Sequence, residues 1–466
     1  MGCIRNRSRI WASWLLLVVG IVYLVSADRA EARFAIGFSP TLGELYTDNI
    51  FYTKNNKEHD FVTTITPTLS ILYAPEGQTV PILNLNISPS GLIFARHSEL
   101  NNFGDNWGLN GGYTYQYSPL LSFHVSDVLG RQGQYRLGPL TQGSFQLPSA
   151  PTAPPPVGGT LPGQGNQNLS NFTSGNSSQL WNYFFLEGRY LYRPDVSFTG
   201  GYSNNYVNNI DQGGSAIYQT ISFRGIYNWR QEHNLHAGFD ISIYNGRDRS
   251  DANNRNNNNV VFNLNLGDDY FNNFQINLSP TLTLAASTGI SLNAGNNGPP
   301  VANNTNITLT KIWETATLSG GVQHGLTSSY GVAGISRTTT VNGQFNYQVT
   351  EKLSTLAGVN FSFYDTDDGN FQTFQAATGA RYQFTPWLAS NLFYAYRWTD
   401  SSTSVAQSSS GNLQAGIVRA NGVYLTLTAN FDLWPNVGLA RSTTMLTPLV
   451  TTPFPQAITP STKPLP

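Results

Sequence analysis

The stretch that decides the fold lies near the C-terminal end of the chain, and it reads Val423-Tyr424-Leu425-Thr426-Leu427-Thr428-Ala429-Asn430-Phe431-Asp432-Leu433. The odd positions are all apolar, and most of the even positions are polar. Because successive side chains of a strand point to opposite faces, this period of two predicts a strand with one apolar and one polar face. Residues 235–243 and 217–229 repeat the pattern. Runs of about 9–11 such residues have the length of a tilted membrane-spanning strand.

The runs are joined in pairs by short turns, which contain Pro119, Pro194, Pro280 or Pro386, or residues 349–353. Longer polar stretches, such as 245–259 and 399–411, separate the pairs. Tight turns at one end and long loops at the other are typical of outer-membrane barrels. Counting the runs predicts an all-β fold, a transmembrane antiparallel up-and-down β-barrel of about 18 strands (about 16–18). Aromatic residues at the strand ends are expected to form its interfacial girdle: Trp107, Tyr192, Trp229, Trp387 and Trp398.

The composition agrees with this prediction. Only 11% of the 466 residues are charged, 13% are aromatic, and the net charge of −1 offers no basic surface for nucleic acid. A soluble β-sandwich, propeller or solenoid also alternates, but would have no reason to carry aromatics at its strand ends. The single cysteine, Cys3, precedes the first apolar run, so no disulfide or cysteine metal site is expected after it.

Four segments are predicted. Residues 1–32 have a basic start and an apolar core from Trp14 to Val25, as in a secretory signal cleaved after Ala27 or Ala32, with a retained anchor as the alternative. Residues 33–434 form the barrel. Within it, the Pro- and Gly-rich segment 132–179 is expected to be an extracellular loop, or else a constriction folded into the mouth. Residues 435–466 are expected to form a Pro-rich, loosely ordered tail.

One motif resembles a known family. Tyr46-Thr47-Asp48-Asn49-Ile50-Phe51, followed by residues 57–67 ending at Pro67, is similar to the opening of β-barrel porin families often encoded with exopolysaccharide export and protein-sorting systems. The similarity of hairpin layout covers roughly residues 34–434. The resemblance implies an outer-membrane barrel that serves polysaccharide export, and it transfers no catalytic residue. The chain departs from the family after Phe431 and Trp434, where a tail follows the last strand.

The polar faces of the predicted strands should line the lumen. Neutral hydrogen-bonding side chains match sugar hydroxyls, and Arg–carboxylate pairs create a transverse field; a wet wall without selectivity is the alternative. The expected lumen residues are Asn110, Gln116, Glu187, Arg189, Arg224, Asp240, Asn263, Asn265, Arg381 and Arg397.

The function expected from these features is a porin-like channel for polar solutes in the bacterial outer membrane, linked to exopolysaccharide export. The alternatives are a structural or adhesive barrel that acts through its loops, and an outer-membrane hydrolase. The expected partners are outer-membrane lipid, a polar solute or saccharide in the lumen, and the barrel-assembly machinery. We expect no cofactor.

No enzyme is expected, although two stretches bring His close to Ser: residues 321–328 around His324, and His124-Val125-Ser126-Asp127. In a chain with six His and many Ser such coincidences arise by chance. Residues 365–370 resemble the start of a calcium loop, but Ala376 stands where the closing Glu should be. A hairpin turn explains them better, so no metal site is predicted.

Overall fold

The computed structural model describes residues 33–51, 53–74, 82–132, 179–209, 215–230, 233–247, 256–272, 281–294, 300–328, 335–366, 369–401 and 416–434. The predicted signal (1–32), almost all of the predicted long loop (133–178) and the predicted tail (435–466) lie outside these residues. No helix in the ranges given is long and apolar enough to cross a membrane.

The strands follow one another along the whole described chain, with a single short 3-10 helix. They are β1 (Arg33–Thr47), β2 (Asp60–Ala74), β3 (Leu83–Phe94), η1 (Ser98–Leu100), β4 (Asn102–Ser118), β5 (Leu121–Gln132), β6 (Gln179–Arg193), β7 (Val196–Asn209), β8 (Ser215–Arg230), β9 (His233–Arg247), β10 (Asn256–Asn272), β11 (Thr281–Asn293), β12 (Val301–Ile312), β13 (Ala316–Ser328), β14 (Ile335–Gln348), β15 (Leu353–Thr366), β16 (Gly369–Thr385), β17 (Leu388–Ser401), β18 (Gly416–Ala429) and β19 (Phe431–Trp434).

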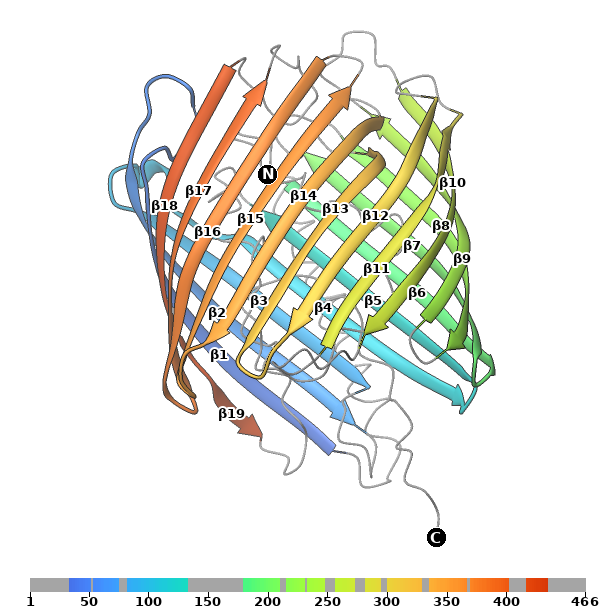
Figure 1. Cartoon of the computed structure of the whole chain (residues 1–466). Coiled ribbons are helices and arrows are strands. Elements are labelled where there is room, and N and C mark those ends of the chain that lie inside the picture. Colours follow the sequence, from blue (N-terminus) through green and yellow to red (C-terminus); the bar gives the residue numbers. More distant parts are fainter. Residues whose placement is uncertain are drawn as a thin grey trace, which may run out of the picture.

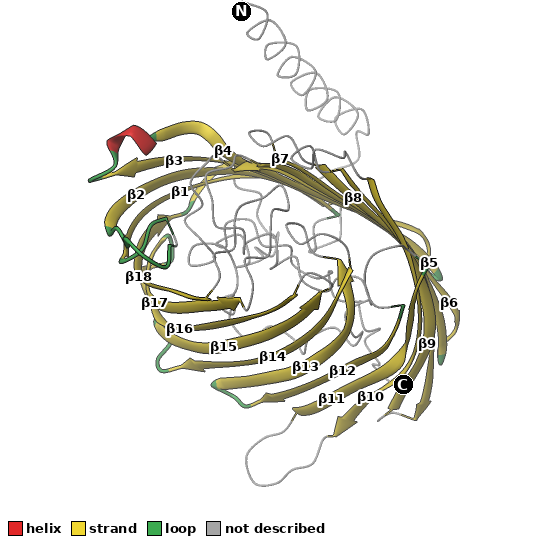
Figure 2. Cartoon of the chain, turned by 90° about the horizontal axis from the view of Figure 1, so that it is seen from above, coloured by secondary structure: helices red, strands yellow, loops and turns green. Residues whose placement is uncertain are grey.

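From β1 to β18 each strand pairs antiparallel with the next, and β1 pairs with both β2 and β18, so the sheet closes on itself. Figure 1 shows the strands tilted together around the wall, and Figure 2 shows the ring that they form when seen from above. Closure gives every barrel strand a hydrogen-bonded neighbour on both sides, as a wall in hydrocarbon requires. The predicted fold class is therefore confirmed.

The last barrel strand is interrupted at Asn430. The sequence predicts one continuous strand over 423–433, but the structure divides it into β18 and β19, so the barrel has 18 strands in the described chain. The pairing with β1 keeps the same register on both sides of the break, which places Pro40 opposite Ala429. Proline has no N–H to donate to the ladder, and this explains the interruption.

The two ends of the barrel differ. Two-residue turns join β4 to β5, β6 to β7 and β16 to β17, at Pro119-Leu120, Pro194-Asp195 and Pro386-Trp387. Proline presets the φ angle that such a turn needs. In the first turn the Ser118 hydroxyl accepts the N–H groups of Leu120 (3.2 Å) and Leu121 (3.1 Å). The strands that bound 133–178 end and begin at the opposite end of the barrel, together with η1.

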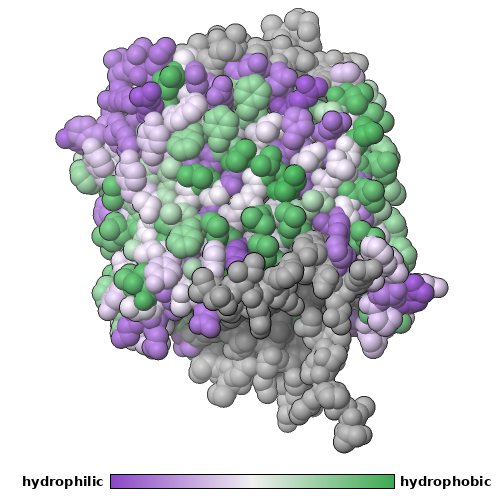
Figure 3. Space-filling model, viewed as in Figure 1, coloured by the Kyte–Doolittle hydropathy of each residue, from purple (hydrophilic) through white to green (hydrophobic). Residues whose placement is uncertain are grey.

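The outer surface is apolar across its middle. The exposed large hydrophobic side chains alternate with buried polar ones along the strands, as in β9, where Phe239 and Ile241 are exposed and Asp240 and Ser242 are buried. On the face in Figure 3, hydrophobic side chains gather in a band across the middle and hydrophilic ones gather at the upper edge. A closed barrel with an apolar outside is the architecture of bacterial outer-membrane proteins, and this chain is one of them.

The Tyr46-Thr47-Asp48-Asn49 motif seals the seam between the first and last strands. The backbone N–H of Asn421 donates to Asp48 Oδ1 (2.6 Å), and the Asn421 side-chain amide donates to Asp48 Oδ2 (2.7 Å). Asn49 Nδ2 donates to the carbonyl oxygens of Arg419 (2.9 Å) and Thr53 (2.7 Å). The motif therefore connects the end of β1 to β18, the first and last strands of the barrel, which are 373 residues apart at Asp48 and Asn421.

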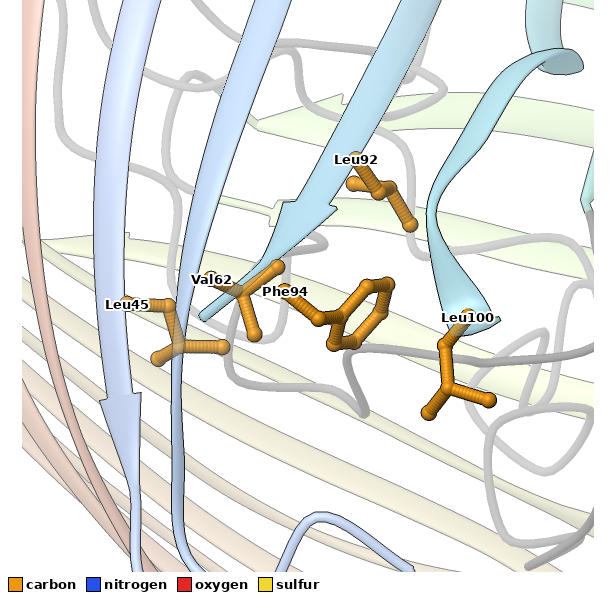
Figure 4. Close-up of a cluster of buried hydrophobic side chains, with 5 residues drawn as sticks. All are labelled: Leu45, Val62, Leu92, Phe94 and Leu100. Atoms are coloured by element: carbon orange, nitrogen blue, oxygen red, sulfur yellow. The ribbon is translucent and has the colours of Figure 1, made fainter. Parts of the chain in front are cut away.

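A small apolar cluster supports the same rim. Leu45, Val62, Leu92, Phe94 and Leu100 are buried against one another, and they come from β1, β2, β3 and η1 (Figure 4). Burial of such side chains stabilises by about 1.5–3 kcal/mol each. The cluster packs the ends of three neighbouring strands under the loop that carries η1.

A histidine between two carboxylates lies beside this cluster. His97 Nδ1 is 2.7 Å from Asp60 Oδ2, and His97 Nε2 is 2.7 Å from Glu58 Oε2. Asp60 is fully buried and also accepts the backbone N–H groups of Phe61 (2.7 Å), Arg96 (3.0 Å) and His97 (3.2 Å). The hydrogen bonds to Asp60 and then Glu58 raise the pKa of His97 above its ordinary value. This contact joins the loop after β1 to the loop after β3.

Candidate functional site on the inner wall

The pleat of the strands assigns each residue to one of two faces. Directly paired residues share a face, and the exposed apolar residues mark the outside of the closed ring. Their sequence neighbours therefore point inward. The structure places all ten predicted lumen residues on this inward face: Asn110 and Gln116 on β4, Glu187 and Arg189 on β6, Arg224 on β8, Asp240 on β9, Asn263 and Asn265 on β10, Arg381 on β16 and Arg397 on β17.

The pairing brings seven of these residues into two adjacent rows across the wall. Each row runs from strand to strand through directly opposed residues. The first row is Glu187, Gly201, Ser222, Asp240, Asn263 and Ser291. The second is Arg189, Thr199, Arg224, Gly238, Asn265, Gly289 and Asn304. Asn110, Arg381 and Arg397 lie outside both rows, and Gln116 continues the second row through Ser122.

Side-chain hydrogen bonds tie part of this wall together. Asn263 Nδ2 donates to Asp240 Oδ1 (2.7 Å), and Ser242 Oγ donates to the same oxygen (3.4 Å). Asn304 Nδ2 donates to Asn265 Oδ1 (3.1 Å). Each bond uses only one of the polar atoms of the side chains that it joins, so the amide and carboxyl groups keep further capacity.

Four buried polar atoms in the two rows make no hydrogen bond within the protein: Asp240 Oδ2, Asn263 Oδ1, Asn265 Nδ2 and Ser291 Oγ. Their residues are no more than 7% exposed. Sequence reasoning missed Ser291, although the alternation of residues 288–293, with Ile290 and Leu292 on the apolar face, carries the signal that would have found it.

Positive charge exceeds negative charge on the inner wall. Among the inward side chains that the structure describes away from the two rims, the arginines are Arg189, Arg224, Arg381 and Arg397, and the carboxylates are Glu187 and Asp240. Within the described ranges, no group of three or more His, Cys, Asp and Glu side chains is arranged to hold a metal ion. The chemistry of the wall is therefore hydrogen bonding with a modest excess of guanidinium groups.

The predicted girdle residues lie toward the two ends of the strands. Tyr192, Trp229 and Trp387 are exposed next to the tight turns. Trp107 and Trp398 lie on the outward face toward the other end, where Trp398 stacks on Phe374 with ring centroids 6.2 Å apart. Aromatic side chains at these levels suit the two interfaces of a bilayer.

The histidines of the two His-containing stretches lie on opposite faces of the wall. On β5, His124 and Ser126 point inward, whereas Asp127 points outward and accepts a hydrogen bond from Asn182 Nδ2 (2.6 Å). His324 lies on the outward face of β13, with its Nδ1 2.8 Å from Thr339 Oγ1. On β5 the alternation thus places Asp127 on the face opposite His124 and Ser126.

Asp365 and Thr366 lie at the end of β15, and Gly369 and Asn370 lie at the start of β16. Asp365 pairs with Asn370 and Thr366 pairs with Gly369, so two residues lie between the strands. An Arg337 guanidinium nitrogen is 3.7 Å from Asp365 Oδ2. Residues 367 and 368, within the predicted turn, lie outside the residues that the structure describes.

Comparisons with known proteins identify no family. No family model matches the chain, and no curated protein matches it. Similar solved structures include OpdL of Pseudomonas aeruginosa (10% identity, 86% of this chain and 99% of that chain, TM-score 0.43) and OpdQ of the same organism (9%, 87% and 99%, TM-score 0.42). A loop-deletion mutant of OmpT, an outer membrane protein of Vibrio cholerae, shares 12% identity over 86% of this chain and all of that chain, with a TM-score of 0.36. At these sequence identities and TM-scores, the similarity says nothing about function.

Proposed function

We propose that the protein is a porin-like channel that lets polar solutes cross the bacterial outer membrane. The observation that supports this most is the contrast between the two faces of one wall: the outside is apolar, and the inside carries hydrogen-bonding and charged side chains. Barrels of about 16–18 strands are wide enough to leave an aqueous channel. The proposal includes no catalytic step.

The finer part of the proposal concerns the solute. Most polar groups of the two interior rows are neutral amides and hydroxyls, which suit the hydroxyl groups of saccharides. Together with the resemblance of residues 46–67 to porins encoded beside exopolysaccharide export systems, this supports passage of a saccharide, and we propose a role in exopolysaccharide export.

Conductance of the refolded protein in a planar bilayer tests the channel. We expect open-channel steps with a weak preference for anions, because arginines outnumber carboxylates on the inner wall. Replacing Arg224 and Arg381 by Ala should move the reversal potential in a salt gradient toward cation preference. The matched control is Arg419→Ala, since Arg419 is exposed on the outward face of β18.

Two results would count against this proposal. Absence of conductance from correctly folded protein would remove the channel itself. An equal reversal potential in the double variant, the control and the unmodified protein would show that the two arginines do not face the ion path. Recording with residues 133–178 deleted measures how far that segment limits the conductance.

A further inference from the structure

The four unpartnered atoms of the two rows lie on three neighbouring strands, β9, β10 and β11. Asp240 on β9 is directly opposite Asn263 on β10, which is directly opposite Ser291 on β11. Asn265 follows on the same face of β10, one inward position further along. Buried polar atoms in folded proteins nearly always have a partner, so four orphans in one place call for an explanation.

The neighbours of these residues explain why the wall itself does not satisfy them. Asn265 lies between Gly238 and Gly289, neither of which has a side chain that could accept its Nδ2 hydrogens. Ser291 has Ala302 on its far side. The glycines are also sterically required, because a Cβ at Gly238 would lie 3.1 Å from the Arg224 Cα, and one at Gly289 would lie 2.7 Å from Asn265 Oδ1.

The chemistry of the four atoms selects one class of ligand. Asp240 Oδ2 and Asn263 Oδ1 accept hydrogen bonds, Asn265 Nδ2 donates, and the Ser291 hydroxyl does both. An ammonium group only donates, so it leaves Asn265 unsatisfied, and Arg224 in the same row repels it. A carboxylate only accepts, and Asp240 repels it. A hydroxyl group both donates and accepts and carries no charge.

We propose that Asp240, Asn263, Asn265 and Ser291 form a binding site for the hydroxyl groups of a neutral polyhydroxylated solute. This inference rests on the proposed channel function and deepens it by naming one wall and one ligand chemistry. Neighbouring strands are about 4.8 Å apart, so Asp240 and Ser291 are separated by about 10 Å. A solute that satisfies all four atoms must span that distance, which favours an oligosaccharide over a monosaccharide.

Block of the ion current by maltohexaose, a neutral linear oligosaccharide, tests the site. We expect concentration-dependent interruptions with maltohexaose, much weaker ones with glucose, and none with polyethylene glycol of the same length. In Asn265→Ala and in Ser291→Ala the half-blocking concentration should rise about tenfold, or about 1.4 kcal/mol. The matched control is Asn360→Ala on β15, a residue of the same type that also points inward and whose Oδ1 accepts a bond from Ser362 Oγ (3.2 Å).

The alternative results are separable. Equal block of the unmodified protein, both site variants and the control would overturn the site while leaving the channel intact, as would equal block by polyethylene glycol. Stronger block by a cationic amino-oligosaccharide would overturn the choice of hydroxyl groups. If no conductance is seen, calorimetric titration of folded, detergent-solubilised protein with maltohexaose decides: binding that Asn265→Ala weakens supports the site, and absence of heat overturns it. The heat-modified shift on gels shows which variants are folded.

Discussion

Replacing Val322 by Arg should destabilise the barrel far more than replacing its neighbour Gln323 by Arg. Val322 is 41% exposed on the outward face of β13, and its direct partners are Ile307 and Val341, which are also apolar and exposed. An arginine facing lipid near the bilayer midplane costs about 2–4 kcal/mol. Gln323 points inward between Asn306 and Thr340, where a polar wall accommodates an arginine of similar length.

The folding equilibrium into lipid vesicles, titrated with urea and followed by tryptophan fluorescence, measures both variants. The expected loss for Val322→Arg is about 2–4 kcal/mol, which is about 30- to 700-fold in the folding constant. The inward variant should stay within about 0.5 kcal/mol, as substitutions in a wet environment usually do. Equal losses, or a loss confined to Gln323→Arg, would show that we have assigned the two faces the wrong way round.

Three further predictions concern the rim with η1. His97→Gln should abolish a pH dependence of stability that the control His59→Gln leaves in place. Because the pKa of His97 is raised in the folded protein, its contribution to stability is fully present below about pH 6.5 and is lost as the pH rises through the raised pKa. Thermal melting temperatures measured against pH test this. Asp48→Ala removes both bonds to Asn421, and urea titration should show a loss of about 1.5–3 kcal/mol, with more rapid amide exchange along β1. Phe94→Ala should cost about 3–5 kcal/mol in the same titration, since it empties a buried position; a loss under 1 kcal/mol would contradict that packing.

The fold could be predicted because a single local rule, apolar and polar side chains in alternation, also determines which way each residue faces. The same rule predicted the strand number and the tight turns that contain Pro119, Pro194 and Pro386. It could not predict the break at Asn430, because the cause is Pro40 on a strand about 390 residues away in sequence, and pairing partners cannot be read from one strand alone.

The candidate site was predictable only in part, for the same reason. Asp240, Asn263 and Asn265 could be predicted because they are polar residues in strands with regular alternation. Ser291 could not be assigned to the site from the sequence, because its role depends on its pairing opposite Asn263. The role of the Asp48-Asn49 motif was also hidden. Its resemblance to known porins implied a family, whereas the hydrogen bonds from Asn421 to Asp48 show that the motif holds the first and last strands together.

Sealing the seam at Asp48 has a consequence for biogenesis. The pairing of β1 with β18 can form only after β18 has been synthesised. Until then, the edge of β1 that faces β18 lacks this partner, although Asp48 and Asn421 are about 370 residues apart in the sequence. Ring closure of so long a segment is the entropically most demanding step, and it comes at the end. The carboxylate of Asp48 then stabilises the closed barrel, because it receives its two hydrogen bonds from Asn421 only when β1 and β18 pair in the correct register.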